Sequence, residues 1–485
     1  MYTPLPKVEG PIANTEENYF FSTMKHTRAP FNLEEYGYVE EEYFLSGTAR
    51  VFENQDGQAT QVGESSYTNR VIVRRPAGEH SGRAWVSILN ASQGYDVEDD
   101  WRRAWNYIIE NGDVYVAVTS KPIQVSALQN FNAERYASMY WGGPMPKLDA
   151  EPGWDPMQIL EGPEEGLAWD ILAQSGRWVR SGENFPAAPH VYMIGQSQSG
   201  MYTNTYLHYF HDVLRGEDGA QIFDGYLPGV AATFSRSLRQ GEKLDTTYRI
   251  GGSAMLPLFA EPHDLDVPVI RVSCEGDTYL FPPDTKPFMA GDGEMSRHWH
   301  IAGGPHSDAR SRVIPDNSEV VKAHRLPRIM DQDYLDQLSC IPLEPFITAS
   351  MTAVDKWARE GVPAAPSVFF VVDEDANRFT ATNGFNDGGV RMGLIENPIA
   401  KFVAADPGNP VVSKMAMSAE DVELARFDSL EDFKAACDEV DDKLEAAGYL
   451  EPIGRRLLHA VEEEIWERVT TGAHALVASP QSVKR

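Results

Sequence analysis

Short apolar runs alternate with longer runs of mixed polarity along residues 70–301. The segment 99–111 carries Trp101, Trp105 and Ile109 at helical spacing, and a glycine follows it, which is typical of a helix end. Strands are predicted at 70–75, 85–89, 114–118, 190–194, 223–227, 267–272 and 297–301, and helices at 99–111, 163–180 and 201–214. Because strands that alternate with helices need crossover connections, the pattern predicts an α/β fold with a mostly parallel sheet flanked by helices.

Two regions depart from this alternation. The connection 231–266 is long and rich in Gly, Arg and Leu, as is typical of an insertion that covers a site, and we expect a lid there. The part after residue 312 carries helical runs at 344–361, 418–426, 431–448 and 453–469. We therefore predict a core domain over 1–312 and a C-terminal helical extension over 313–485 that packs on it.

Net charge excludes several classes of partner. The 485 residues include 42 Lys and Arg against 72 Asp and Glu, which gives a formal charge of −30. Such a chain repels phosphate backbones and anionic lipid headgroups, so we expect neither a nucleic-acid nor a membrane partner. A small-molecule substrate remains as the expected partner.

Cysteine content and the N-terminal sequence bear on the compartment. Cys274, Cys340 and Cys437 are too few and too scattered for a disulfide framework, and none forms a Cys-x-x-Cys pair. The first twenty residues lack a basic segment followed by an apolar one, and no window of eighteen apolar residues occurs. A cytoplasmic protein is therefore expected.

The strongest chemical signal is the segment Ile194-Gly-Gln-Ser-Gln-Ser-Gly200, which lies between a predicted strand and a predicted helix. A nucleophilic serine needs such a tight turn, with small residues two positions before and after it. Gly195 and Ser199 are the small neighbours of Ser197. The helix also directs unpaired N–H groups at the turn, although a turn with a capping role alone has the same composition.

Candidate partners for Ser197 follow two later predicted strands. The strand 267–272 leads to Glu275 and Asp277, and the strand 297–301 leads to His306. Parallel strands present their carboxyl ends at one edge, where the active site of an open sheet lies. We expect His306 to act as general base and Asp277 to orient it, with Glu275 as the alternative acid.

Backbone amides are expected to stabilise a developing oxyanion. Gln198, which follows the nucleophile, supplies one N–H, and the loop after the strand 85–89 supplies the second from Ser92 or Ala91. Of the other histidines, His298 and His300 are expected to be core or rim residues.

Metal and cofactor sites are not expected. His208 and His211 share one face of a helix but have no third ligand near them in sequence.

Aromatic residues gather in segments expected at the same edge of the sheet. Tyr140 and Trp141 precede a Gly- and Pro-rich turn, and Tyr279 follows the acid. These three are predicted to contact substrate in a largely apolar pocket, unless they serve only as rim packing. The pocket interpretation predicts a bulky hydrophobic or aromatic substrate.

These motifs resemble those of the α/β-hydrolase superfamily, and in particular of a bacterial family of alpha/beta hydrolase domain proteins. The family's Gly-Glu-Ser-Gln-Ser, Thr-Glu-Thr-Asp and Glu-Val-Ala-Gly-x-x-His segments correspond to Gly195-Gln-Ser-Gln-Ser199, Ser273-Cys-Glu-Gly-Asp277 and His300-Ile-Ala-Gly-Gly-Pro-His306. Further similar segments lie at 38–48, 89–94, 134–138 and 388–391. The resemblance implies the hydrolase fold and a Ser/His/acid triad, and it implies no substrate.

Two positions depart from the family pattern. Gln196 stands where the family has Glu, which should make the site less acidic, and Gly200 stands where alanine is frequent.

The expected function is hydrolysis of a carboxylic ester through an acyl-enzyme on Ser197. The same triad serves amides, lactones and thioesters, which the sequence does not separate. A non-catalytic binder that keeps the fold and the pocket is the alternative from another class. The helical extension suits a homo-oligomer as well as a core.

Overall fold

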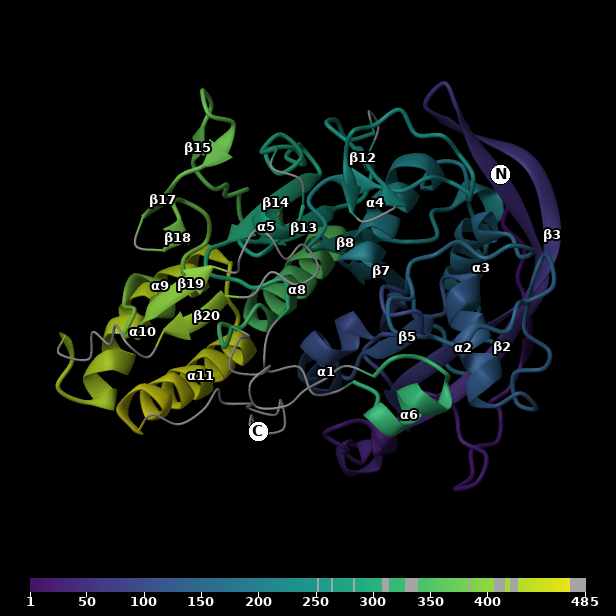
Figure 1. Cartoon of the computed structure of the whole chain (residues 1–485), viewed down its shortest axis with the longest axis horizontal. Coiled ribbons are helices and arrows are strands. Elements are labelled where there is room, and N and C mark those ends of the chain that lie inside the picture. Colours follow the sequence, from purple (N-terminus) through teal and green to yellow (C-terminus); the bar gives the residue numbers. More distant parts are fainter. Residues whose placement is uncertain are drawn as a thin grey trace. The chain divides into compact units, whose positions relative to one another are not determined.

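The computed structural model describes residues 1–250, 253–262, 265–281, 284–307, 314–327, 339–382, 384–404, 415–418 and 426–471 (Figure 1). They fold as two compact units. The first unit comprises Met1–Pro228, Phe234–Leu256 and Val313–Arg328. The second comprises Gly229–Thr233, Pro257–Arg312 and Ile329–Arg485. The predicted boundary at 312/313 between a core and an extension stays a prediction.

The first unit is built on a sheet with the strand order β1-β2-β3-β5-β4-β7-β8. Its strands are β1 (Lys7–Glu9), β2 (Tyr38–Gln55), β3 (Gln58–Pro76), β4 (Arg83–Ile88), β5 (Val114–Val118), β7 (His190–Gln196) and β8 (Gly225–Gly229), and β6 (Tyr140–Trp141) pairs with β3. Strands β5, β4 and β7 run parallel, as the alternating pattern predicts. All five residues of β5 are buried, which explains why this strand is continuously apolar.

Helices pack against this sheet, and four of them reach ten residues or more. The helices of the first unit are α1 (Asp99–Asn111), α2 (Pro122–Phe131), α3 (Ala168–Ser181), α4 (Gln198–Phe210) and the short α6 (Asn317–Lys322). Helix α1 ends at Gly112, whose φ of 67° and ψ of 34° are left-handed, so the predicted cap is confirmed. Helix α2 is absent from the predicted elements. Its residues are buried almost all round, so they carry little helical periodicity.

Strands β2 and β3 form a long antiparallel hairpin that the sequence pattern predicted only at 70–75. The turn lies at Asp56-Gly57, and the register shifts between Val51 and Phe52. Residues near the turn are largely exposed, whereas residues 71–74 are all buried. The distal half therefore lacks the apolar run that revealed the proximal half.

An ion-pair network is buried where β2 and β3 meet the following loops. Arg70 lies with Nε 2.7 Å from Glu42 and Nη1 2.6 Å from Asp96, and all three side chains are fully buried. Arg135 joins the same Glu42 at 2.6 Å. Burial opposes the charge of Arg70, but the neighbouring carboxylates more than compensate and raise its pKa.

The second unit contains the parallel strands β13 (Val269–Cys274) and β14 (Ser296–Ile301), as predicted. Its described helices are α5 (Asp277–Leu280), α8 (Glu344–Glu360), α9 (Gly393–Glu396), α10 (Leu430–Ala447) and α11 (Pro452–Thr471). Helix α8 packs on β13 and α11. Short strand pairs join β15 (Val372–Asp373) to β16 (Arg378–Phe379), β17 (Ala381–Thr382) to β18 (Phe385–Asn386), and β19 (Lys401–Ala404) to β20 (Met415–Ser418). The C-terminal region is thus helical with small antiparallel additions.

The described residues of the predicted insertion 231–266 contain short strands. These are β9 (Phe234–Ser235), β10 (Arg249–Ile250), β11 (Ser253–Ala254) and β12 (Leu256–Pro257), while 251–252 and 263–264 lie outside the described residues. Its role as a lid stays a prediction. The predicted helix 418–426 falls largely on 419–425, which also lie outside them. In the part of the chain that the structure describes, we find no helix with the length and apolar character of a membrane span.

Candidate active site

Ser197 occupies the turn between β7 and α4, in the first unit. Its φ of 58° and ψ of −121° fall outside the regions that L-residues usually adopt. Gly195 permits this turn, since a Cβ there would lie 2.5 Å from the carbonyl oxygen of Ser199. A strained serine at a strand-to-helix turn is the geometry of a nucleophile elbow.

Polar side chains of α1 form hydrogen bonds with Gln196, the residue before Ser197. The Gln196 carboxamide, buried under the turn, accepts from Arg103 Nη1 at 2.5 Å and donates to Asp100 Oδ1 at 3.1 Å. Ser87 donates to the other Asp100 oxygen at 2.6 Å. Burial raises the pKa of Asp100 to about 7, despite these hydrogen bonds. Gln196 fits here because its carboxamide both accepts from Arg103 and donates to Asp100, whereas a glutamate would place a second carboxylate beside Asp100.

The two backbone amides considered for the oxyanion site have different partners. Ala91 N donates to Gln198 Oε1 at 3.2 Å, whereas Ser92 N donates to Asn90 Oδ1 at 2.7 Å within its own loop. Asn90 Nδ2 in turn donates to the carbonyl of Gln196 at 3.1 Å. The Ser92 amide is therefore not available to an oxyanion in this structure, because it donates to the side chain of Asn90. The Ala91 amide instead donates to a side chain of the helix that follows Ser197.

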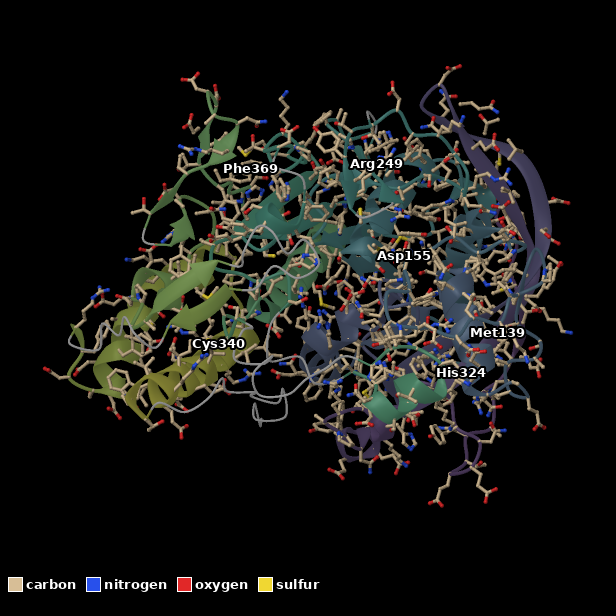
Figure 2. All side chains as sticks on the ribbon, viewed as in Figure 1. Met139, Asp155, Arg249, His324, Cys340 and Phe369 are labelled. Carbon is tan, nitrogen blue, oxygen red and sulfur yellow. The ribbon has the colours of Figure 1, made fainter. Side chains whose placement is uncertain are left out.

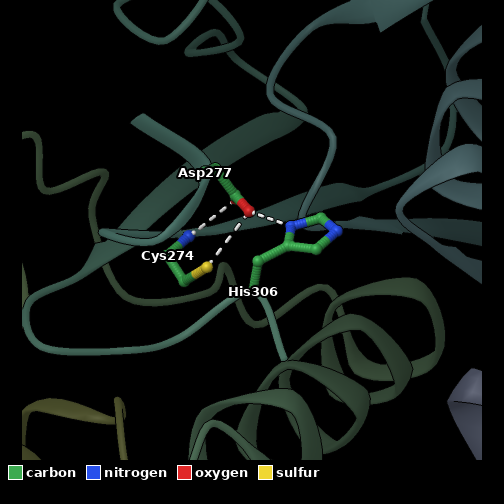
Figure 3. Close-up of side chains that lie close together, drawn as sticks. All are labelled: Cys274, Asp277 and His306. Carbon is green, nitrogen blue, oxygen red and sulfur yellow. Dashed lines mark hydrogen bonds and ion pairs between the residues drawn. The ribbon is translucent and has the colours of Figure 1, made fainter. Parts of the chain in front are cut away.

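Asp277 and His306 lie together in the second unit, just past the ends of β13 and β14 (Figure 3). His306 Nδ1 is 2.5 Å from Asp277 Oδ1, and both side chains are buried. Asp277 also accepts from Cys274 N at 2.9 Å and from Cys274 Sγ at 3.1 Å. A carboxylate only accepts, so the His306 proton lies on Nδ1 and Nε2 is the basic nitrogen.

The same three side chains could in principle hold a metal ion. Cys274, Asp277 and His306 have ligand-type atoms within 4.8 Å of one another. Two ligands on one tetrahedral zinc ion, each about 2.0–2.2 Å from it, lie roughly 3.3 Å apart. The 2.5 Å between His306 and Asp277 is instead a hydrogen-bond distance. The cluster is therefore arranged for hydrogen bonding and does not fit an ion without rearrangement.

Glu275, the alternative acid, has a different environment. Its carboxylate accepts from Gly303 N at 2.8 Å and from Asn386 N at 2.9 Å. Burial raises its pKa to about 7, and these two hydrogen bonds only partly oppose the shift. Glu275 thus ties the end of β13 to two other segments of the second unit, and Asp277 is the acid that contacts His306.

The other histidines are engaged as structural residues. His298 contacts Ser273 Oγ at 2.8 Å and the Ala290 carbonyl at 2.7 Å. His300 contacts the Phe288 carbonyl at 3.0 Å, and burial lowers its pKa to about 4.

On the helix after the elbow, His211 contacts the Tyr226 hydroxyl at 2.8 Å. The contacts of His298 and His300 agree with the core role expected for these two strand histidines.

The three predicted substrate contacts differ in exposure. Trp141 is fully buried in β6 and its Nε1 donates to Asn69 at 3.1 Å, so it packs the interior and offers no surface to substrate. Tyr140 is 38% exposed on the same short strand. Tyr279 is partly buried on α5 of the second unit, and burial raises its pKa. Substrate contact stays a prediction for Tyr140 and Tyr279.

Sequence reasoning missed residues whose role depends on tertiary neighbours. The sequence pattern places Asp100 and Arg103 in a helix and gives them no further role, and it does not single out Lys121, which lies three residues past the end of the buried strand β5. A lysine a few residues past an apolar parallel strand can indicate a ligand site, because that position lies at the sheet edge where ligands bind.

Comparison with known proteins gives distant structural matches and one family. The solved structures include a putative dienelactone hydrolase from Klebsiella pneumoniae (11% identity, TM-score 0.26, 48% of this chain and 73% of that one). They also include a hyperthermophilic esterase from Pyrobaculum calidifontis (14%, 0.20, 39% and 45%) and acetyl xylan esterase 1 from Thermoanaerobacterium (12%, 0.22, 47% and 53%). The chain thus spans about half the length of the latter two.

No curated protein sequence matches the chain. A family model described as "Alpha/beta hydrolase domain" matches residues 8–459, which include Ser197, Asp277 and His306. Because this match covers nearly the whole chain, the protein belongs to the alpha/beta hydrolase domain family.

Proposed function

We propose that the protein is a serine hydrolase that cleaves a carboxylic ester of a bulky hydrophobic or aromatic small molecule. The observation that carries this proposal is the strained backbone of Ser197, with φ 58°, on the turn between a buried parallel strand and a helix. Strain of this kind persists where function requires it. The hydrogen bond between His306 and Asp277 supports the proposal independently.

The reaction proceeds in two balanced steps. Ser197 Oγ attacks the ester carbonyl while His306 Nε2 takes its proton. The tetrahedral intermediate then collapses to an acyl-enzyme, and the proton passes to the departing alcohol. Water then attacks the acyl-enzyme carbonyl while the same nitrogen takes its proton. The bond to Ser197 Oγ breaks, the acid leaves, and the proton passes from His306 Nε2 to Ser197 Oγ. Asp277 orients His306 and stabilises its charged form.

The oxyanion of each intermediate requires two donors. We assign them to the amides of Gln198 and Ala91, since the Ser92 amide is engaged within its own loop. Substrate binding then displaces the Gln198 side-chain oxygen from the Ala91 amide.

A fluorophosphonate probe tests the nucleophile. Labelling is expected in the wild type and in the exposed-serine control Ser138→Ala, and it should be absent from Ser197→Ala. A panel of esters, lactones, amides and thioesters then assigns the bond that is cleaved. Labelling that persists in Ser197→Ala would refute the proposed nucleophile. Tight reversible ligand binding without turnover of any panel member would instead favour a binding protein.

The acid is tested by comparing Asp277→Asn with Glu275→Gln. Loss of the orienting carboxylate should lower kcat by roughly 10³- to 10⁴-fold, because the imidazole then favours the wrong tautomer. Glu275→Gln should lower the melting temperature and change kcat little, since the Glu275 carboxylate contacts backbone amides. A larger kcat loss in Glu275→Gln would reverse the assignment.

A further inference from the structure

Lys121 is a buried lysine with too few partners. Only 1% of the residue is exposed, at the start of α2 and just past the end of β5. Its ammonium lies 3.9 Å from Glu165 Oε2, beyond hydrogen-bond distance, and no other carboxylate of the described residues is as close. Lysines are almost never fully buried unless they are paired. The environment of Lys121 is therefore incomplete.

A second cation and a phenol share this environment. Tyr202 of α4 is 5% exposed, and the Lys121 ammonium lies 5.8 Å from its ring centroid. The positive charge of Arg236 acts to lower the pKa of both Lys121 and Tyr202. The backbone amide of Arg236 donates to Thr205 Oγ1 of α4 at 2.8 Å. Arg236 Nε is buried and has no hydrogen-bond partner among the described residues. Lys121 thus lies beside a phenol of the helix after Ser197, and Arg236 is hydrogen-bonded to the next turn of the same helix.

The charges in this cluster do not balance. Lys121 is opposed by one nearby carboxylate, Glu165, and more weakly by the exposed Asp155. Of these residues, Asp155 is labelled in Figure 2. Burial lowers the pKa of Lys121 to about 8, because Glu165 opposes the shift only in part and Arg236 adds to it. A buried net positive charge is costly without an anion.

Hydrogen bonds connect the Lys121 turn to the elbow. Ser120 Oγ donates to the Leu89 carbonyl at 2.7 Å, at the start of the loop that carries Ala91. Asn90 of that loop donates to the carbonyl of Gln196, directly before Ser197. Lys121 and the proposed nucleophile therefore belong to the loops at the carboxyl ends of the neighbouring strands β5, β4 and β7, where open α/β sheets bind ligands.

We propose that Lys121, Arg236 and the Tyr202 hydroxyl form a subsite for a carboxylate group of the substrate, so that the preferred esters carry a negative charge. The inference rests on the proposed esterase function. One carboxylate supplies the single negative charge that the cluster lacks, and both cations and the phenol donate hydrogen bonds to its oxygens.

Matched esters test the subsite. The wild type should prefer mono-p-nitrophenyl glutarate to p-nitrophenyl pentanoate, or 4-carboxyphenyl acetate to 4-methylphenyl acetate, according to which side of the ester carries the charge. Within each pair the two esters differ in a carboxylate against a methyl group. Lys121→Met should lower the ratio of kcat/KM for charged over uncharged ester by about tenfold or more, as expected for a charge-assisted hydrogen bond.

Two further variants accompany Lys121→Met. Lys147→Met removes an exposed lysine of the same unit and should leave the ratio unchanged. Arg236→Gln, which removes a half-buried cation, should lower the ratio as Lys121→Met does and covers the case in which the latter fails to fold. An uncharged preference in both wild-type pairs, or a ratio that neither variant lowers, would overturn the subsite.

Binding measured without turnover separates the two proposals. Calorimetry of glutarate and of 4-carboxyphenol with Ser197→Ala should detect binding of one of them, and adding Lys121→Met should weaken it by about tenfold or more. Inorganic phosphate at equal concentration should bind less well. Lys121-dependent binding alongside persistent activity in Ser197→Ala would retain the subsite and reject the nucleophile. Binding that is independent of Lys121 would reject the subsite alone.

Discussion

Gly195 is the residue on which the elbow geometry depends most directly. The space for a Cβ is filled by the Ser199 carbonyl oxygen at 2.5 Å and by Thr203 Oγ1 at 2.8 Å. Backbone atoms cannot yield as a flexible side chain can. Gly195→Ala must therefore separate β7 from α4, which moves Ser197 away from its strained conformation.

We expect Gly195→Ala to lower the free energy of unfolding by about 1–3 kcal/mol, the usual cost of overpacking. Fluorophosphonate labelling of Ser197 should slow in the same variant. Denaturant titration and labelling kinetics measure the two effects. Gly78→Ala is the control, since nothing lies within 4 Å of the added methyl group. Equal stability of the two variants would contradict the tight contact at Gly195.

Residue types and strand ends sufficed to nominate Ser197, Asp277 and His306. Each follows a predicted strand, and their order along the chain carries chemical meaning. The choice between Ala91 and Ser92 was not accessible, because backbone donors leave no mark on the sequence. The shortage of negative charge around Lys121 could not be predicted from the sequence either, since it depends on Glu165 and other residues far away in sequence.

Elements were predictable where one face or the whole strand is buried. Helix α1 and strand β5 match the predicted ranges because their apolar positions recur with a clear period or without interruption. The β2–β3 hairpin was largely missed, since its exposed distal half has no apolar run. Strand β3 also places Arg70 and Arg74 in the interior, where a pattern based on hydrophobicity expects none.

Arg70 on β3 gives a prediction about this element. Arg70→Met removes one of the two arginines that pair with the buried Glu42, and it removes the arginine that pairs with the buried Asp96. The free energy of unfolding should fall by about 3–5 kcal/mol, as expected when one member of a buried ion pair is removed. Urea titration followed by tryptophan fluorescence provides the measurement.

Arg75→Met on the same strand is the matched control. Arg75 pairs with Glu41 at 3.0 Å, but both side chains are partly exposed, so the loss should stay below about 1 kcal/mol. Comparable losses in Arg70→Met and Arg75→Met would argue against a stabilising role for the buried network.

At the scale of the whole molecule, the acidic residues behind the charge of −30 lie in two different environments. Most acidic residues repel one another across solvent, where salt screens them. A few are buried without sufficient cations, and the second unit contains such a group. Glu462 of α11 is fully buried, and neither of its carboxylate oxygens has a hydrogen-bond partner among the described residues.

Burial, together with the nearby carboxylates of Asp441 and Asp438, raises the pKa of Glu462 to about 8. The folded chain therefore holds a proton that the unfolded chain releases near its ordinary pKa of 4.5. The contribution of Glu462 to stability is complete below that pKa and is lost as pH rises toward 8. The slope reaches at most about 1.4 kcal/mol per pH unit.

Glu462→Gln should remove this dependence, because an amide does not ionise. Relative to wild type, the variant should gain unfolding free energy as pH rises from 5 to 8, as measured by denaturant titration at each pH. Glu463→Gln on the same helix is the control, since its side chain is 58% exposed and pairs with Lys434. Glu463→Gln should differ from wild type by a constant amount. A pH-independent difference for Glu462→Gln would mean that Glu462 is already ionised in the folded protein, and that its charge is balanced within the second unit.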